Sequence, residues 1–104
     1  MKIYITQNDI NETIRLAVVT VAKKIKLEDI DWKTTNELFE EIKLSGHPLF
    51  KLLDNYILNY MAWVTFIQDH KDRDEYSSEE LQKLDKLAKN RNSTRSDLKN
   101  AINT

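Results

Sequence analysis

Residues 48–68 read PLFKLLDNYILNYMAWVTFIQ and form the most apolar stretch of the chain. A helix turns by about 100° per residue, so most of these apolar side chains fall within one broad arc. The opposite arc still carries Leu58, Ala62 and Phe66 beside its polar residues. A helix that is apolar on both sides is usually packed by neighbours all round. We therefore expect residues 48–68 to be the central helix of the fold.

Shorter amphipathic segments lie on either side of this stretch. Residues 10–25 repeat apolar side chains at helical spacing, and residues 38–42 and 81–88 do so over shorter lengths. Gly46 follows the second segment, where a helix C-cap needs positive φ, and Pro48 suits a first helical turn. Polar residues 90–93 predict a break before a last short helix. Four pairs have the spacing of a capping box: Thr6 with Asp9, Thr34 with Glu37, Ser77 with Glu80, and Thr94 with Asp97, which would open the last short helix.

The fold class follows from these segments. Residues 1–5 alternate enough to form a short strand or an extended arm. One glycine and one proline are too few turn residues for an all-β domain. The sequence thus predicts an all-α, compact bundle of about five helices around the central helix 48–68, in a single domain spanning residues 1–104.

The amino-acid composition excludes some kinds of chemistry and indicates the cellular compartment. The chain has no cysteine, which excludes disulfides and thiol chemistry, and its net charge of -1 gives no general attraction to nucleic acid. The N-terminal residues do not resemble a signal peptide, and the apolar run 56–67 is too short to span a membrane. We therefore expect a cytoplasmic protein. Its richness in Lys, Asn and Ile is typical of an AT-rich genome, such as that of a low-GC bacterium or of its phages and plasmids.

No residues form a recognisable catalytic or metal-binding set. His47 and His70 each stand alone, and the acidic segment 69–75 lacks the glycine and the terminal glutamate of a calcium loop. His70 is expected to be exposed in this polar segment, and His47 to have a capping or turn role. There is no glycine-rich phosphate loop and no nucleophile beside a base. The prediction is a non-enzymatic protein with no catalytic residue, no cofactor and no metal.

One candidate surface is apolar. Leu58, Ala62 and Phe66 are spaced four residues apart on the side of the central helix that should be polar. Leu16 and Val19 also lie off the apolar face of the first helix. Together these five side chains would form an exposed patch for a protein partner or for a second copy in a homodimer. The alternative is that other helices cover them.

The second candidate surface is basic. Residues 83–104 contain six basic residues against two acidic ones. Residues 77–88 (SSEELQKLDKLA) followed by residues 93–98 (STRSDL) resemble the two helices of ribbon-helix-helix DNA-binding proteins. The resemblance implies a dimer whose second helix meets phosphate at its N-terminus. It covers about a quarter of the chain, and the acidic segment 69–76 stands where the family has its DNA-reading strand. The candidate nucleic-acid contacts are Lys83, Lys86, Lys89, Arg91 and Arg95.

These observations favour one function over another. The expected function is protein–protein interaction, as a regulator, inhibitor or immunity-type factor with an unidentified protein partner. The alternative is a small DNA-binding transcriptional regulator that uses a ribbon-helix-helix-like hairpin at residues 77–102. A purely structural subunit of a larger assembly would have the same sequence features.

Overall fold

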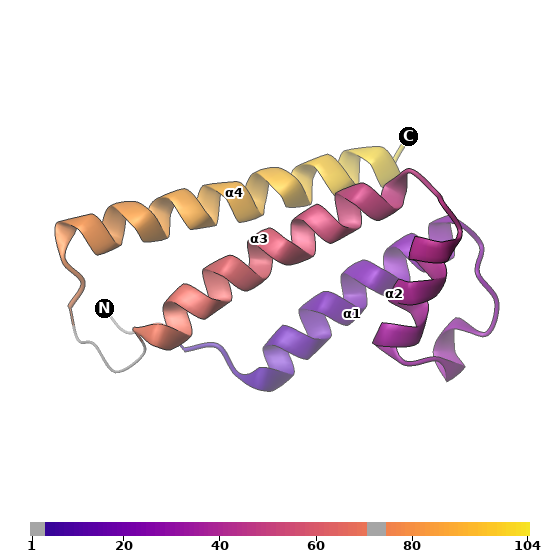
Figure 1. Ribbon diagram of the computed structural model, residues 1–104, viewed down its shortest axis with the longest axis horizontal. Coiled ribbons are helices and arrows are strands. Elements are labelled where there is room, and N and C mark those ends of the chain that lie inside the picture. Colours follow the sequence, from indigo (N-terminus) through magenta and orange to yellow (C-terminus); the bar gives the residue numbers. More distant parts are fainter. Residues whose placement is uncertain (1–3, 71–74) are drawn as a thin grey trace.

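The computed structural model describes residues 4–70 and 75–104. In chain order these form α1 (Gln7–Lys24), a 3₁₀ turn η1 (Ile30–Trp32), α2 (Thr35–Leu44), α3 (Leu49–Asp69) and α4 (Ser78–Ile102). The three long helices lie alongside one another, and the short α2 covers one end (Figure 1). The fold is therefore an all-α bundle, elongated to 46 × 26 × 19 Å.

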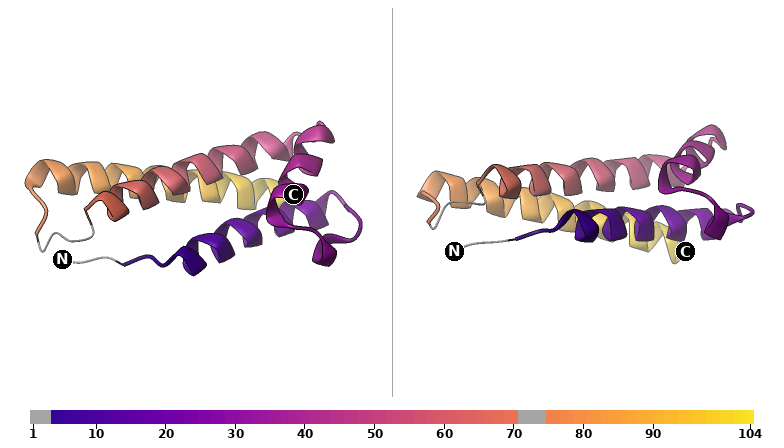
Figure 2. Two further views of the ribbon diagram at one scale, coloured as in Figure 1. Left: turned by 60° about the horizontal axis from the view of Figure 1, so that its bottom comes forward. Right: turned by 90° about the horizontal axis from the view of Figure 1, so that it is seen from below.

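The prediction of a central apolar helix is confirmed by α3. It packs along α4 on one side and contacts α1 on another, with α4 antiparallel to it (Figures 1 and 2). Leu53 and Val64 are fully buried, and Tyr56 and Tyr60 nearly so. Most of the core is a single cluster that these side chains share with α1 and α2.

The ends of the helices follow the local rules. Thr6 and Asp9 form a complete capping box at the start of α1, as do Ser77 and Glu80 at the start of α4. Thr34 caps α2 by accepting a hydrogen bond from the backbone N–H of Glu37. The structure therefore confirms the predicted caps at Thr6, Thr34 and Ser77.

The turn between α2 and α3 is also the predicted one. Gly46 has φ of +69°, which a residue with a Cβ adopts only with strain. His47 Nδ1 accepts a hydrogen bond of 3.1 Å from the backbone N–H of Leu49 and so satisfies one free donor of α3. Phe39 of α2 and Phe50 of α3 meet edge to face with ring centroids 5.1 Å apart, which fixes the angle of α2.

The loop before α2 and the N-terminal residues differ from what the sequence predicts. Residues 28–33 have the sequence of a loop anchored by Ile30 and Trp32. Ile30 does pack against the core, but Trp32 is wrong as an anchor because its side chain is 89% exposed. Residues 1–3 of the predicted strand or arm are not described, and Tyr4 and Ile5 are in neither helix nor strand. Within residues 4–70 and 75–104 no strand is present.

The prediction of about five helices is wrong at the C-terminal end, because α4 is one helix without a break. Residues 90–93 are polar but include neither glycine nor proline, so the local cost of a helix there is small. Thr94 does not cap a new helix. Its hydroxyl donates to the backbone carbonyls of Asn90 and Arg91, one turn back within the same helix. The predicted hairpin of residues 77–102, and with it the ribbon-helix-helix geometry, is therefore absent.

The junction of α3 and α4 partly covers His70, which was expected to be exposed. The His70 ring stacks on Phe66 with centroids 4.2 Å apart, and its Nδ1 lies 2.7 Å from the Phe66 carbonyl oxygen. Its Nε2 lies 3.0 Å from a carboxylate oxygen of Glu80, whose other oxygen accepts from the Ser77 backbone N–H. This set of contacts holds the end of α3 against the start of α4. Asp72 and Asp74 of the predicted acidic connector lie outside the described residues.

In the described part of the chain, no helix has the length and apolar character needed to cross a membrane.

Candidate functional site

A groove of about 620 Å³ runs between α1 and α4, with α3 as its floor. Both α1 and α4 pack mainly on other helices rather than on each other, so a space remains between them. They run in the same direction and α3 runs opposite to both (Figures 1 and 2). Its volume lies within the range typical of ligand pockets, about 300–1,000 Å³. It is lined by Ile5, Asp9, Thr13, Leu16, Ala17, Thr20, Tyr56, Tyr60, Trp63, Arg91, Asn92, Arg95, Leu98, Lys99 and Ile102.

The floor of the groove is aromatic. Tyr56, Tyr60 and Trp63 follow one another at helical spacing along α3, and each pair of neighbouring rings has centroids 6.1 Å apart. The two tyrosines are more than nine-tenths buried, whereas Trp63 is half-buried. These rings give the groove a rigid apolar base with polar edges.

The wall formed by α4 is basic. Arg91 is seven residues from both Leu84 and Leu98, which are buried, so it lies on the inward-facing stripe of α4. Its guanidinium stacks over the Trp63 ring at 4.0 Å from the centroid, and it donates two hydrogen bonds to Asn92 Oδ1. Trp63 thus gives this inward-facing cation an electrostatically favourable surface.

Arg95 and Lys99 continue the basic wall one and two turns further along α4. Both side chains are exposed, and within the described residues neither has an ion-pair partner. The charge of Arg95 acts on a tyrosine of the groove floor. Burial raises the pKa of Tyr56, and the positive charges of Arg95 and Arg91 offset part of that rise. The groove therefore combines an apolar floor with a positive potential along one edge.

The wall formed by α1 is mostly small and neutral. Thr13, Ala17 and Thr20 follow one another at helical spacing, and the Thr20 hydroxyl is already used in a hydrogen bond to the Leu16 carbonyl. Leu16 lies beside them and is 69% exposed. Short side chains on this wall leave room for a backbone to approach closely. The one acidic side chain among the described lining residues is Asp9, near the N-terminal end of α1.

The structure does not bring the predicted apolar patch together. Leu58 and Ala62 are exposed, Leu58 by 61%, but Phe66 is only 8% exposed because it packs against Leu84 of α4 and His70. The prediction that Phe66 is exposed is therefore wrong.

The two α1 members of that patch also separate from the rest. Val19 is half-buried and packs against the core. Leu16 lines the groove, whereas Leu58 is two residues from Tyr56 and Tyr60 and so lies on nearly the opposite face of α3. Of the five predicted residues, only Leu16 belongs to the groove.

The five predicted nucleic-acid contacts also diverge. Lys83 lies 5.8 Å from the centroid of the Phe66 ring, and Lys89 forms an exposed ion pair of 2.9 Å with Asp85. Lys86 is exposed on the outer side of α4. Arg91 and Arg95 instead face the groove. A straight helix cannot present all five cations to one phosphate backbone.

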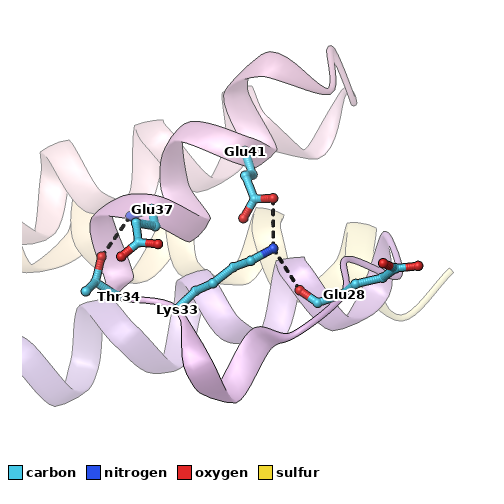
Figure 3. Close-up of polar contacts among 5 residues, drawn as sticks. All are labelled: Glu28, Lys33, Thr34, Glu37 and Glu41. Atoms are coloured by element: carbon cyan, nitrogen blue, oxygen red, sulfur yellow. Dashed lines mark hydrogen bonds and ion pairs between the residues drawn. The ribbon is translucent and has the colours of Figure 1, made fainter.

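A second polar arrangement lies at the far end of the bundle and is structural. Lys33 Nζ donates to the Glu28 backbone carbonyl and to Glu41 Oε1, both at 2.9 Å (Figure 3). These contacts tie the loop around η1 to α2. The hydrogen bond with Glu41 raises the Lys33 pKa. An amine held protonated in this way is a poor nucleophile.

The sequence contained a signal for the groove that the predictions did not use. Arg91 is seven residues from both Leu84 and Leu98, so it falls on the apolar stripe of α4. A cation on such a stripe indicates that α4 faces an aromatic ring or a solvent-filled groove at this position. The aromatic floor carries no separate signal, because Tyr56, Tyr60 and Trp63 are indistinguishable in sequence from other core residues of α3.

Comparison with known proteins finds no match for this chain among protein-family models, characterised proteins or solved structures.

Proposed function

We propose that this chain is a non-enzymatic protein-interaction module, of the regulator, inhibitor or immunity type, and that it binds its partner in the groove between α1 and α4. The observation that carries the proposal is the pairing of an aromatic floor with cations that have no ion-pair partner within the described residues. Trp63 is the half-buried ring of this floor and lies beside Arg91. Aromatic and arginine side chains that meet in one concave site are typical of binding hot spots.

Other features support binding rather than catalysis. In the described residues, no group of three or more histidine and carboxylate side chains lies close enough to hold a metal ion. The described lining residues of the groove include no histidine, and their one carboxylate, Asp9, accepts the Thr6 backbone N–H in the capping box of α1. The Thr20 hydroxyl is bonded to the Leu16 carbonyl. The groove therefore supplies recognition chemistry and no evident reacting group.

Site-specific photo-crosslinking tests the proposal directly. A photoreactive phenylalanine analogue would replace Leu16 in one variant and Leu58 in another, in cells of the source organism. Both leucines are exposed on long helices, but only Leu16 lines the groove, which makes Leu58 a matched control. We expect a discrete protein adduct from position 16 and none from position 58. An adduct from position 58 alone, or from neither position, would refute binding in the groove.

A further inference from the structure

The shape of the groove limits what can fill it. Residues 9–20 of α1 and residues 91–102 of α4 border it, and each stretch spans eleven residue steps, or about 17 Å of helix. The three helices that line the groove, α1, α3 and α4, are roughly aligned with one another (Figures 1 and 2). A helix of about three turns matches that length, and it would complete a four-helix arrangement with α1, α3 and α4.

The charges select among such helices. Arg91, Arg95 and Lys99 are spaced four residues apart, so their side chains form one edge about two turns long. The facing wall of α1 does little to neutralise these positive charges, since Thr13, Ala17 and Thr20 are uncharged. Its one carboxylate, Asp9, lies toward one end of the groove. An occupant that covers this edge would remove water from the cations and must therefore bring negative charge.

We infer that the occupant is an acidic amphipathic helix of a partner protein. Its apolar stripe would rest on Trp63 and the exposed Leu16, and its carboxylates, spaced three or four residues apart, would pair with Arg95 and Lys99. Arg91 is already stacked on Trp63 and extends that surface. This inference rests on the proposed function, because it specifies the chemistry of the partner in the same groove.

Peptide binding to the purified protein tests the inference. The first probe is a stapled helical peptide of about four turns, with leucines along one face and glutamates along one edge at positions i, i+4 and i+8. The second replaces the glutamates by lysines, and stapling keeps the helicity of the two equal. Trp63 reports binding by fluorescence in a Trp32→Phe background, since Trp32 is 89% exposed and does not line the groove. We expect saturable binding of the acidic peptide and at least about tenfold weaker binding of the basic one.

Two charge-reversed variants locate the interaction. Arg95→Glu with Lys99→Glu changes the groove edge, and Lys86→Glu with Lys89→Glu makes the same change of net charge on other faces of the same helix. The groove variant should bind the acidic peptide at least about tenfold more weakly, and the control should change it by no more than about twofold. Equal losses in both variants would mean that net charge alone attracts the peptide, and would overturn the inference. Circular dichroism melts of both variants check that folding is unchanged.

The outcomes separate this inference from the proposed function. If crosslinking from position 16 captures a protein but the acidic peptide binds no better than the basic one, the acidic helix is wrong and partner binding stands. If neither experiment gives a signal, both fail. If sedimentation shows a dimer that Arg95→Glu with Lys99→Glu dissociates, the occupant is a second copy, which also overturns the inference.

Discussion

Leu53→Ala should be among the most destabilising single substitutions in α3. Leu53 is 0% exposed and lies in the core cluster to which all four helices contribute. The substitution removes three carbon atoms, worth about 2.4 kcal/mol at about 0.8 kcal/mol per buried methylene. The surrounding helices cannot close the space completely, so a cavity term adds to this loss, and measured values for such changes are about 2–5 kcal/mol. We expect about 3 kcal/mol.

Leu58→Ala provides the matched control for Leu53→Ala. It makes the same chemical change in the same helix, but Leu58 is 61% exposed, so the expected loss is below about 0.5 kcal/mol. The measurement is urea unfolding followed by far-UV circular dichroism, with stabilities compared at equal slope. In a thermal melt, Leu53→Ala should lower Tm by about 12–24 °C, given about 4–8 °C per kcal/mol in a domain of this size. A difference between the two variants smaller than about 0.5 kcal/mol would show that the buried face of α3 is assigned wrongly.

Three further predictions concern α4 and the groove. Spin labels at positions 86 and 100, measured by pulsed electron paramagnetic resonance, should be about 21 Å apart along a continuous helix, excluding label length. A much shorter distance would support a helical hairpin at residues 77–102 instead. Ser77→Ala should cost about 1 kcal/mol in urea unfolding through loss of the N-cap, and an unchanged midpoint would contradict the capping box. Since burial raises the pKa of Tyr56, its neutral form stabilises the fold below the ordinary tyrosine pKa, and this stability is lost as pH rises through the folded-state pKa. Tyr56→Phe should therefore lose stability less steeply than the wild type above about pH 10, and equal slopes would count against the shift.

Local rules predicted the parts of the fold that depend on adjacent residues. Helix capping, the positive φ of Gly46 and the apolar density of α3 each depend on a few neighbouring positions. The structure confirms the φ, the apolar density and the caps at Thr6, Thr34 and Ser77. The fourth predicted cap, Thr94, is wrong because it lies inside α4. The break at residues 90–93 was wrong because its polar residues only weakly oppose a helix. A tertiary contact also falls within residues 90–93, since Arg91 of α4 stacks on Trp63 of α3. Such contacts outweigh a weak local preference against helix.

The candidate surfaces depended on packing that the sequence does not specify. Since α3 is apolar on both sides, its own pattern cannot say which side α4 will cover. Phe66 is buried because the first turns of α4 and the ring of His70 cover it, whereas Leu58, two turns earlier, has no such cover in the described structure. The groove likewise arises from the separation of α1 and α4, which no single segment encodes.

The residues that make the groove suited to binding also explain why the bundle leaves it open. Direct packing of α1 against α4 would bring Arg95 and Lys99 against Thr13 and Ala17, which carry no charge. Burying two cations without anions costs more than the small apolar area of that contact returns. The cations therefore favour a solvated gap between α1 and α4 in the free protein. The same charges that oppose packing of α1 on α4 would pair with an anionic helix in the groove and so select it over neutral or basic helices.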